Sequence, residues 1–258
     1  MSGPWTPPAG GRPAANPRRT WVVLVVLLAA GVAFLVHTNG LSRYQVAYVV
    51  VLIPSIILHE VSHGFVANLL GDDTAKRAGR LTLNPLPHID PLGSVVLPAL
   101  LILSGSPVAF GWAKPVPVNV AKLRHPRNDS VWVSLAGPAT NAVLFVAAAL
   151  LFRYFLAHQL FLSPGATELP YGYEFLLAAG LANVAVGVFN LIPLPPLDGS
   201  AVVERLVPDR HLAGYYRIRP YGMLIVFLFA LFVLRGSAGG HLFSGELRLW
   251  GALSGVHL

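Results

Sequence analysis

The run from Tyr48 to Leu70, YVVVLIPSIILHEVSHGFVANLL, is almost wholly apolar, and His59-Glu60-Val61-Ser62-His63 lies in its second half. We expect a helix from about Gln45 to Leu70, long enough at about 39 Å to cross a bilayer. Two histidines four residues apart lie on one face of such a helix, where both imidazoles can bind one metal ion. Because ionisable side chains are costly in hydrocarbon, this stretch indicates a functional site.

The composition identifies a membrane protein. Of the 258 residues, 55% are hydrophobic and 11% are charged, whereas soluble domains carry about 25% charged residues. Cys is absent, which excludes a thiolate site, so a transition metal must bind through His and carboxylate side chains. The net charge of +7 does not indicate nucleic acid, because Lys and Arg cluster in loops on one side of the predicted bilayer.

We predict an all-α polytopic membrane protein with about five to six transmembrane helices. Residues 1–20, rich in Pro, Gly and Ala, are expected to form a disordered basic cytoplasmic tail. Residues 21–235 would be the membrane-embedded domain with its core in 45–200, and 236–258 stay unassigned. Besides the helix with both histidines, the expected spans are Trp21–Val36 (retained, or alternatively a signal peptide), Asn128–Phe155, Tyr173–Asn190 and the short Tyr221–Leu234.

The segment between the second and third predicted spans is the least regular. Residues 84–93 are rich in turn formers, and the apolar run 94–103 is too short to span, which favours a re-entrant segment. Residues 110–120 alternate loosely, and Pro115 and Pro117 confine such a strand to an edge. We therefore expect a small membrane-embedded β/re-entrant loop beside the helix with both histidines, whose edge at 116–120 could accept an added strand.

Asp198 is the candidate third ligand. Three prolines at 193, 195 and 196 must end the fourth predicted helix before it, so Asp198 lies on irregular backbone. Fourteen of the 18 Lys and Arg lie in the N-terminal tail and in the segments after the second and fourth helices, which makes that side cytoplasmic. The two histidines and Asp198 are then near the same face of the bilayer and form one site.

This set of residues is typical of a catalytic zinc site. Two histidines and one carboxylate leave one coordination position for water, so we predict one Zn2+ per chain bound by His59, His63 and Asp198. Zinc lowers the pKa of such a water to about 7, which makes amide hydrolysis feasible at neutral pH. Glu60 is predicted to be the general base that later protonates the leaving amine.

Two further polar residues have open roles. Asn141, a lone amide in the third span, either hydrogen-bonds an oxyanion or the substrate backbone, or makes an interhelical hydrogen bond only. His88, in the turn-rich segment, is either a local hydrogen-bonding group or a substrate or pH-sensitive contact that the loop brings to the site.

Three motifs in this order resemble the site-2 protease family of intramembrane zinc metalloproteases (peptidase family M50). The motifs are His59-Glu60-Val61-Ser62-His63, Gly137-Pro138-Ala139-Thr140-Asn141, and Asn190-x-x-Pro193-x-Pro195-x-Leu197-Asp198-Gly199. The resemblance covers residues 45–200. It implies a three-helix catalytic core, zinc bound by His59, His63 and Asp198, and regulated cleavage of transmembrane protein substrates within the lipid bilayer of the cell membrane. The 156–172 loop is too short for the PDZ domain that many members insert there.

The alternative reading is a zinc-binding membrane protein without peptidase activity, either a transporter or a substrate-holding pseudoprotease. A transporter would carry further intramembrane ionisable groups along a path, whereas only Glu60 and Asp198 of the 11 acidic residues lie well inside apolar segments. A pseudoprotease would have lost the base, and Glu60 is present. Both observations favour the protease.

Overall fold

The computed structural model describes residues 42–90, 93–94, 112–160, 170–217, 219–222, 224–225, 228 and 237–256. Three of its helices are long and apolar enough to cross a membrane: α2 (Arg43–Leu69), α5 (Pro126–Ala157) and α6 (Tyr171–Asn190). They confirm that the second, third and fourth predicted spans are long apolar helices. The predicted first span, most of the fifth and residues 95–111 of the predicted loop lie outside the described residues.

Local sequence signals set where these helices begin and end. Ser42 and Gln45 form a capping box at the start of α2, in which each side chain accepts a hydrogen bond from the other's backbone N–H. At the start of α5, Pro126 occupies the first turn and Asp129 accepts the His125 N–H at 2.8 Å. The prolines after Asn190 end α6, as predicted.

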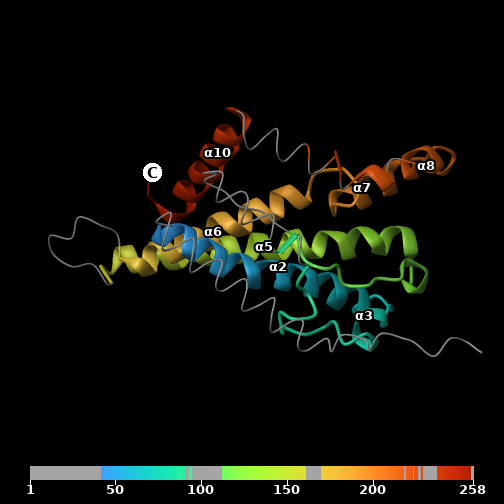
Figure 1. Ribbon diagram of the computed structural model, residues 1–258, viewed down its shortest axis with the longest axis horizontal. Coiled ribbons are helices and arrows are strands. Elements are labelled where there is room, and N and C mark those ends of the chain that lie inside the picture. Colours follow the sequence, from blue (N-terminus) through green and yellow to red (C-terminus); the bar gives the residue numbers. More distant parts are fainter. Residues whose placement is uncertain are drawn as a thin grey trace, which may run out of the picture. The chain divides into compact units, whose positions relative to one another are not determined.

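The three long helices pack along one another (Figure 1). Their shared core is built from small and aromatic side chains, among them Ala47, Tyr48, Phe152 and Leu181. Outside this core, many large apolar side chains on the same helices are exposed, including Val50, Val143 and Leu150. A bundle with a packed interior and an apolar exterior is suited to lipid.

The C-terminal stretch 236–258, unassigned from the sequence, contains helix α10 (Ser237–Ser254). Trp250 anchors it, because its side chain is fully buried and meets the rings of Phe145 and Phe152 at centroid distances of 6.1 and 5.3 Å. Helix α10 therefore packs on α5 and α6, at the end opposite to α7 (Figure 1).

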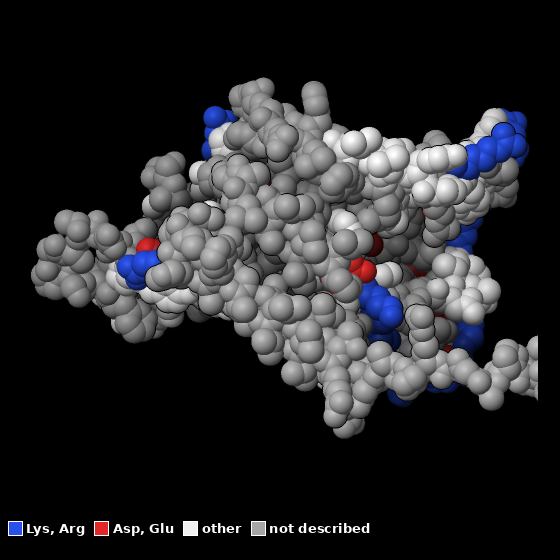
Figure 2. Space-filling model, viewed as in Figure 1, with Lys and Arg blue, Asp and Glu red and all other residues white. Residues whose placement is uncertain are grey.

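Short elements extend from the other end of the bundle. The basic segment after the fourth predicted helix is largely helical, with α7 (Gly199–Leu206) and α8 (Asp209–Tyr216) followed by η3 (Arg219–Tyr221). The Arg127 guanidinium donates to the Val207 carbonyl at 2.6 Å, and Arg205 donates to the Asn128 side chain at 2.7 Å, which ties α7 to the start of α5. On the face drawn in Figure 2, Lys and Arg lie mostly toward this end.

Residues 70–125 lead from α2 back to α5 through α3 (Thr74–Arg77) and η2 (Val120–Lys122). Residues 112–119 have no regular secondary structure. No strand occurs in the described part of the chain, so the predicted β element is not confirmed there.

Candidate metal centre

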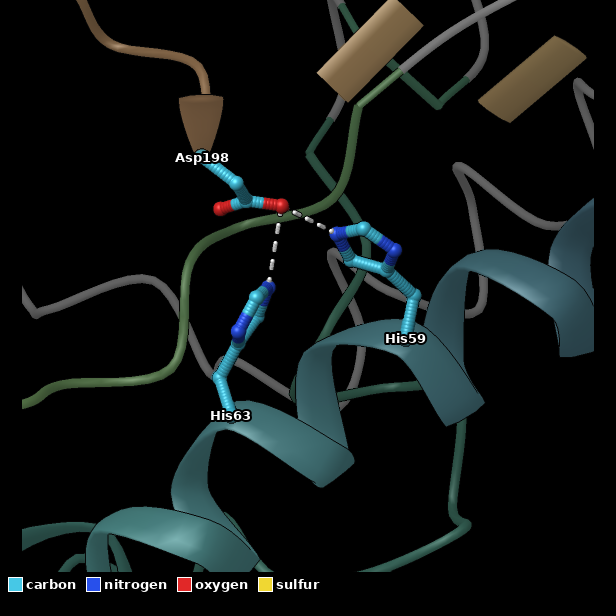
Figure 3. A group of neighbouring side chains, drawn as sticks. All are labelled: His59, His63 and Asp198. Carbon is cyan, nitrogen blue, oxygen red and sulfur yellow. Dashed lines mark ion pairs between the residues drawn. The ribbon is translucent and has the colours of Figure 1, made fainter. Parts of the chain in front are cut away.

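The two predicted histidine ligands and the predicted aspartate come together at one point. His59 and His63 project from successive turns of α2 toward the Asp198 carboxylate, which lies where the chain enters α7 (Figure 3). Asp198 Oδ2 is 2.9 Å from His59 Nε2 and 3.3 Å from His63 Nε2. Within the described residues, these are the His, Asp and Glu side chains whose donor atoms gather closely enough to share a metal ion, all within 4.8 Å of one another.

Each histidine uses its other ring nitrogen to hold its orientation. His63 Nδ1 is 2.7 Å from the Val133 carbonyl oxygen, which can only accept, so Nδ1 carries the proton. His59 Nδ1 is 2.6 Å from Asn141 Oδ1 and donates in the same way. With the proton on Nδ1, each ring can offer the Nε2 lone pair to a metal ion beside Asp198, which is the arrangement of metal-ligating histidines.

A cation fits this site on electrostatic grounds. His63 Nε2 and Asp198 Oδ2 are buried and have no hydrogen-bond partner. Two imidazole lone pairs and a carboxylate all need positive charge opposite them, whereas protonating both rings would put two imidazolium groups at a centroid distance of 4.7 Å. A divalent metal ion satisfies all three groups at once.

The α5 backbone makes room for the site at Gly137. A Cβ atom at this position would lie 2.5 Å from His59 Nε2 and 2.5 Å from His63 Nε2, the two nitrogens that face Asp198. A side chain at position 137 would therefore fill the space in front of Nε2 of both histidines, and only glycine leaves that space open. In the sequence, Gly137 stood out only as a member of the motif Gly137-Pro138-Ala139-Thr140-Asn141.

Glu60 lies between the ligands in sequence, and a backbone amide holds its carboxylate. Glu60 Oε2 accepts the Val116 N–H at 3.0 Å. The Val116 side chain packs on α2 at Gly64, where an added Cβ would lie 2.8 Å from Val116 Cγ1. Residues 112–119 are thus fixed against the turn of α2 that carries the site. Because Val116 already donates to Glu60 and Pro115 and Pro117 have no N–H, this edge has few donors left for a substrate strand.

A buried carboxylate, Asp72, anchors the far end of the same segment. Its Oδ2 accepts the Asn119 N–H, and its Oδ1 accepts the N–H and the hydroxyl of Thr74. Burial alone would raise the pKa of Asp72, but these hydrogen bonds, the hydroxyl of Thr74 foremost, together with the charge of Lys122, hold its pKa below the usual value. Asp72 therefore remains a carboxylate that joins the end of α2 to residues 112–119.

The two residues with open roles have partners inside the chain. Asn141 is fully buried; its Oδ1 faces His59, and its Nδ2 donates to Asn183 Oδ1 at 2.7 Å. His88 is 1% exposed, its Nε2 lies 3.0 Å from the Thr82 carbonyl oxygen, and its own carbonyl accepts the Lys114 N–H. Burial lowers the pKa of His88, so its ring is neutral near pH 7. Neither residue belongs to the ligand group.

Sequence reasoning missed Asn183, which contacts Asn141 from α6. The signal was available, because Asn183 is a second lone amide in an apolar span and such a group needs a partner. Asp72 and Gly137 were also missed as parts of the site. Their roles depend on contacts between segments far apart in the chain: no local pattern marks Asp72, and the motif that contains Gly137 does not show its approach to both histidines.

Comparisons with known proteins agree with this chemistry. Residues 171–233 match the profile of peptidase family M50. The chain is 41% identical over 201 residues to the "Putative zinc metalloprotease YwhC" of Bacillus subtilis, covering 78% of this chain and 84% of that one. It is 32% identical over 223 residues to the "Putative zinc metalloprotease Rip2" of Mycolicibacterium smegmatis, covering 83% and 80%. No solved structure matches the chain.

Proposed function

Since the chain belongs to peptidase family M50, the site-2 proteases, we propose that it is an intramembrane zinc metalloprotease that hydrolyses peptide bonds in or near the transmembrane segments of membrane proteins. The cofactor is zinc. The observation that carries the proposal is the meeting of His59, His63 and Asp198 in front of Gly137, with Glu60 on the same turn of α2.

In this mechanism His59, His63 and Asp198 would hold the ion, and Glu60 would move the protons. When bound, zinc lowers the pKa of a coordinated water molecule and polarises a peptide carbonyl. Glu60 accepts a proton from the attacking water and delivers it to the amine of the leaving fragment. The Val116 N–H supports this role, because one hydrogen bond to Oε2 fixes the carboxylate and leaves Oε1 to exchange the proton. The partners of Asn141 favour positioning of His59 over contact with the substrate.

We place the active site near the cytoplasmic face of the plasma membrane, within a domain formed by residues 21–235. The distribution of positive charge supports this placement, because Lys and Arg are enriched on the cytoplasmic side of membrane proteins. Here they occur in the segment 76–127 and in α7 and α8, toward the end of the bundle where Asp198 enters α7. A transmembrane substrate must unwind before a carbonyl reaches the metal. We propose that the unwound segment is held at the predicted edge over residues 116–120, where carbonyl groups must supply most of the hydrogen bonds because few N–H donors remain.

The test is cleavage by the reconstituted protein. Glu60→Gln is expected to lower the cleavage rate of a single-span membrane protein by about 10²- to 10⁴-fold, because a general base contributes a factor of this size. Zinc content should stay at the wild-type level, since Glu60 is not a ligand. Rates would be measured in vesicles with and without a zinc chelator.

Glu204→Gln, a change of the same type on α7, is the matched control and should cleave normally. Normal turnover by Glu60→Gln would remove Glu60 from the mechanism. A wild-type protein that binds zinc but cleaves none of a panel of single-span substrates would favour the zinc-binding protein without peptidase activity.

A further inference from the structure

A chain of buried polar side chains runs through the three-helix core to His59. It starts at Ser55 on α2, passes through Asn183 on α6 and Asn141 on α5, and returns to α2 at His59. All four side chains are at most 3% exposed. In an apolar bundle such a chain must be fully hydrogen-bonded, because a buried polar group without a partner is costly.

The direction of every hydrogen bond in this chain follows from two backbone carbonyls. Ser55 Oγ is 2.8 Å from the Val51 carbonyl oxygen, so the only hydroxyl proton is donated there. Ser55 can then only accept from Asn183, whose side chain lies 3.0 Å away. The same end of Asn183 is 2.8 Å from the Ala179 carbonyl oxygen, which also accepts only. This end of Asn183 is therefore the NH2 group.

The donor and acceptor of the remaining hydrogen bonds, from Asn183 to His59, follow from this assignment. Asn183 turns its oxygen to Asn141, so the group of Asn141 that lies 2.7 Å away must be its NH2. Asn141 then presents its own oxygen to His59 Nδ1 at 2.6 Å, and Nδ1 must carry the ring proton. The lone pair is left on Nε2, the atom that faces Asp198 and His63.

We propose that Asn183 is a positioning residue: through Asn141 it fixes the tautomer and the ring orientation of His59 for metal binding. Without Asn183, the Asn141 amide can turn its NH2 group to Nδ1, which then has to accept, and the ring proton moves to Nε2. His59 in that tautomer cannot bind the metal. This proposal rests on the proposed zinc site and adds a residue that touches neither the metal nor its ligands.

His63 has no such dependence, because its Nδ1 donates to the Val133 backbone carbonyl. A backbone carbonyl cannot exchange a donor for an acceptor. The two ligands of α2 are thus held in different ways, one by the main chain and one by a side-chain relay through α6. A side-chain substitution can therefore remove the relay that holds His59, but not the backbone carbonyl that holds His63.

The test is zinc affinity, measured by chelator competition on the full-length protein in detergent. Asn183→Leu, which keeps the size but removes the amide, is expected to weaken zinc binding about 10- to 100-fold, the usual effect of losing a partner of a ligand. Asn183→Ser, smaller and still polar, is the second variant in case leucine prevents folding. Ring 15N chemical shifts of the metal-free protein should show His59 protonated at Nδ1 in the wild type but not in the variants.

Thr140→Val is the matched control. It removes the 2.9 Å hydrogen bond from Thr140 to Ser62, which also joins α5 to α2 but ends on no ligand. Zinc affinity should not change. The Asn141→Leu/Asn183→Leu double variant should bind zinc no more weakly than Asn141→Leu alone, because Asn183 acts through Asn141.

Wild-type zinc affinity in both Asn183 variants would overturn the proposal, and so would an equal loss in Thr140→Val. A wild-type protein that fails to bind zinc would instead overturn the proposed function. The two failures are therefore distinct.

Discussion

Gly137→Ala is expected to abolish zinc binding and, with it, proteolysis. The new methyl group would lie 2.5 Å from His59 Nε2 and from His63 Nε2, so the helices must separate or both rings must turn away from Asp198. Zinc affinity should fall by more than about 100-fold, beyond the usual effect of losing a ligand's partner. Overpacking of this kind should also destabilise the metal-free protein by about 1–3 kcal/mol. Chelator competition and thermal unfolding in detergent measure the two effects.

Gly172→Ala is the control for this substitution. Gly172 lies in the first turn of α6, and an added Cβ there meets nothing within 4 Å. Zinc affinity and cleavage should equal those of the wild type, because the change touches only an open surface. If Gly137→Ala bound zinc as tightly as Gly172→Ala, the assigned position of the metal in front of Gly137 would be wrong.

Asp72→Asn is expected to destabilise the protein and to slow cleavage without removing a ligand. The amide keeps one acceptor oxygen but turns an NH2 group toward the N–H of Thr74 or Asn119, where the carboxylate accepts. The loss should be about 2 kcal/mol, since hydrogen bonds to charged groups contribute about 1.5–3 kcal/mol each. For a chain of this size that corresponds to roughly 4–8 °C in the unfolding temperature.

The pH dependence of this loss has a defined sign. The folded protein lowers the pKa of Asp72, so the carboxylate stabilises the fold at any pH above the usual carboxyl range. This contribution disappears as the pH falls through the lowered pKa of Asp72. The difference in unfolding temperature between wild type and Asp72→Asn should therefore be constant near pH 7 and shrink below about pH 4.

Asp73→Asn serves as the control, because the neighbouring aspartate is exposed and pairs with Arg77 at 2.6 Å and Lys122 at 3.3 Å. Exposed ion pairs contribute less than about 1 kcal/mol. Cleavage by Asp72→Asn should fall as well, since release of Asn119 loosens the segment that holds Glu60. Equal unfolding temperatures for the two variants at pH 7 would show that Asp72 does not anchor this segment.

The sequence was sufficient to predict the three long helices and the residues that meet at the candidate metal site, because both follow from local rules. A long apolar run can only be a helix in lipid, and histidines four residues apart must share a face of it. Asp198 could be predicted because prolines mark the end of α6 and the charge distribution orients the helices. None of these inferences requires knowledge of how one helix contacts another.

The parts that the sequence did not reveal all depend on contacts between helices. The role of Asn183 can be recognised only when α6 is known to place it against Asn141. The role of Gly137 can be recognised only when α5 is known to cross both histidines. The position of α7 likewise depends on such contacts, because Arg127 and Arg205 tie it to the start of α5. The packing of Trp250, rather than any local pattern, fixes α10 on the bundle.

The candidate ligands come from two distant segments of the chain, helix α2 and the turn before α7. This separation sets the order in which the metal site is completed during synthesis. Helix α2 with both histidines leaves the ribosome and enters the membrane while α6 and the proline-rich turn before Asp198 are still unmade. Two imidazoles alone do not supply the three protein ligands of a catalytic zinc ion. On the proposed function, the nascent chain would lack a complete zinc site, and with it proteolytic activity, until translation has passed Asp198.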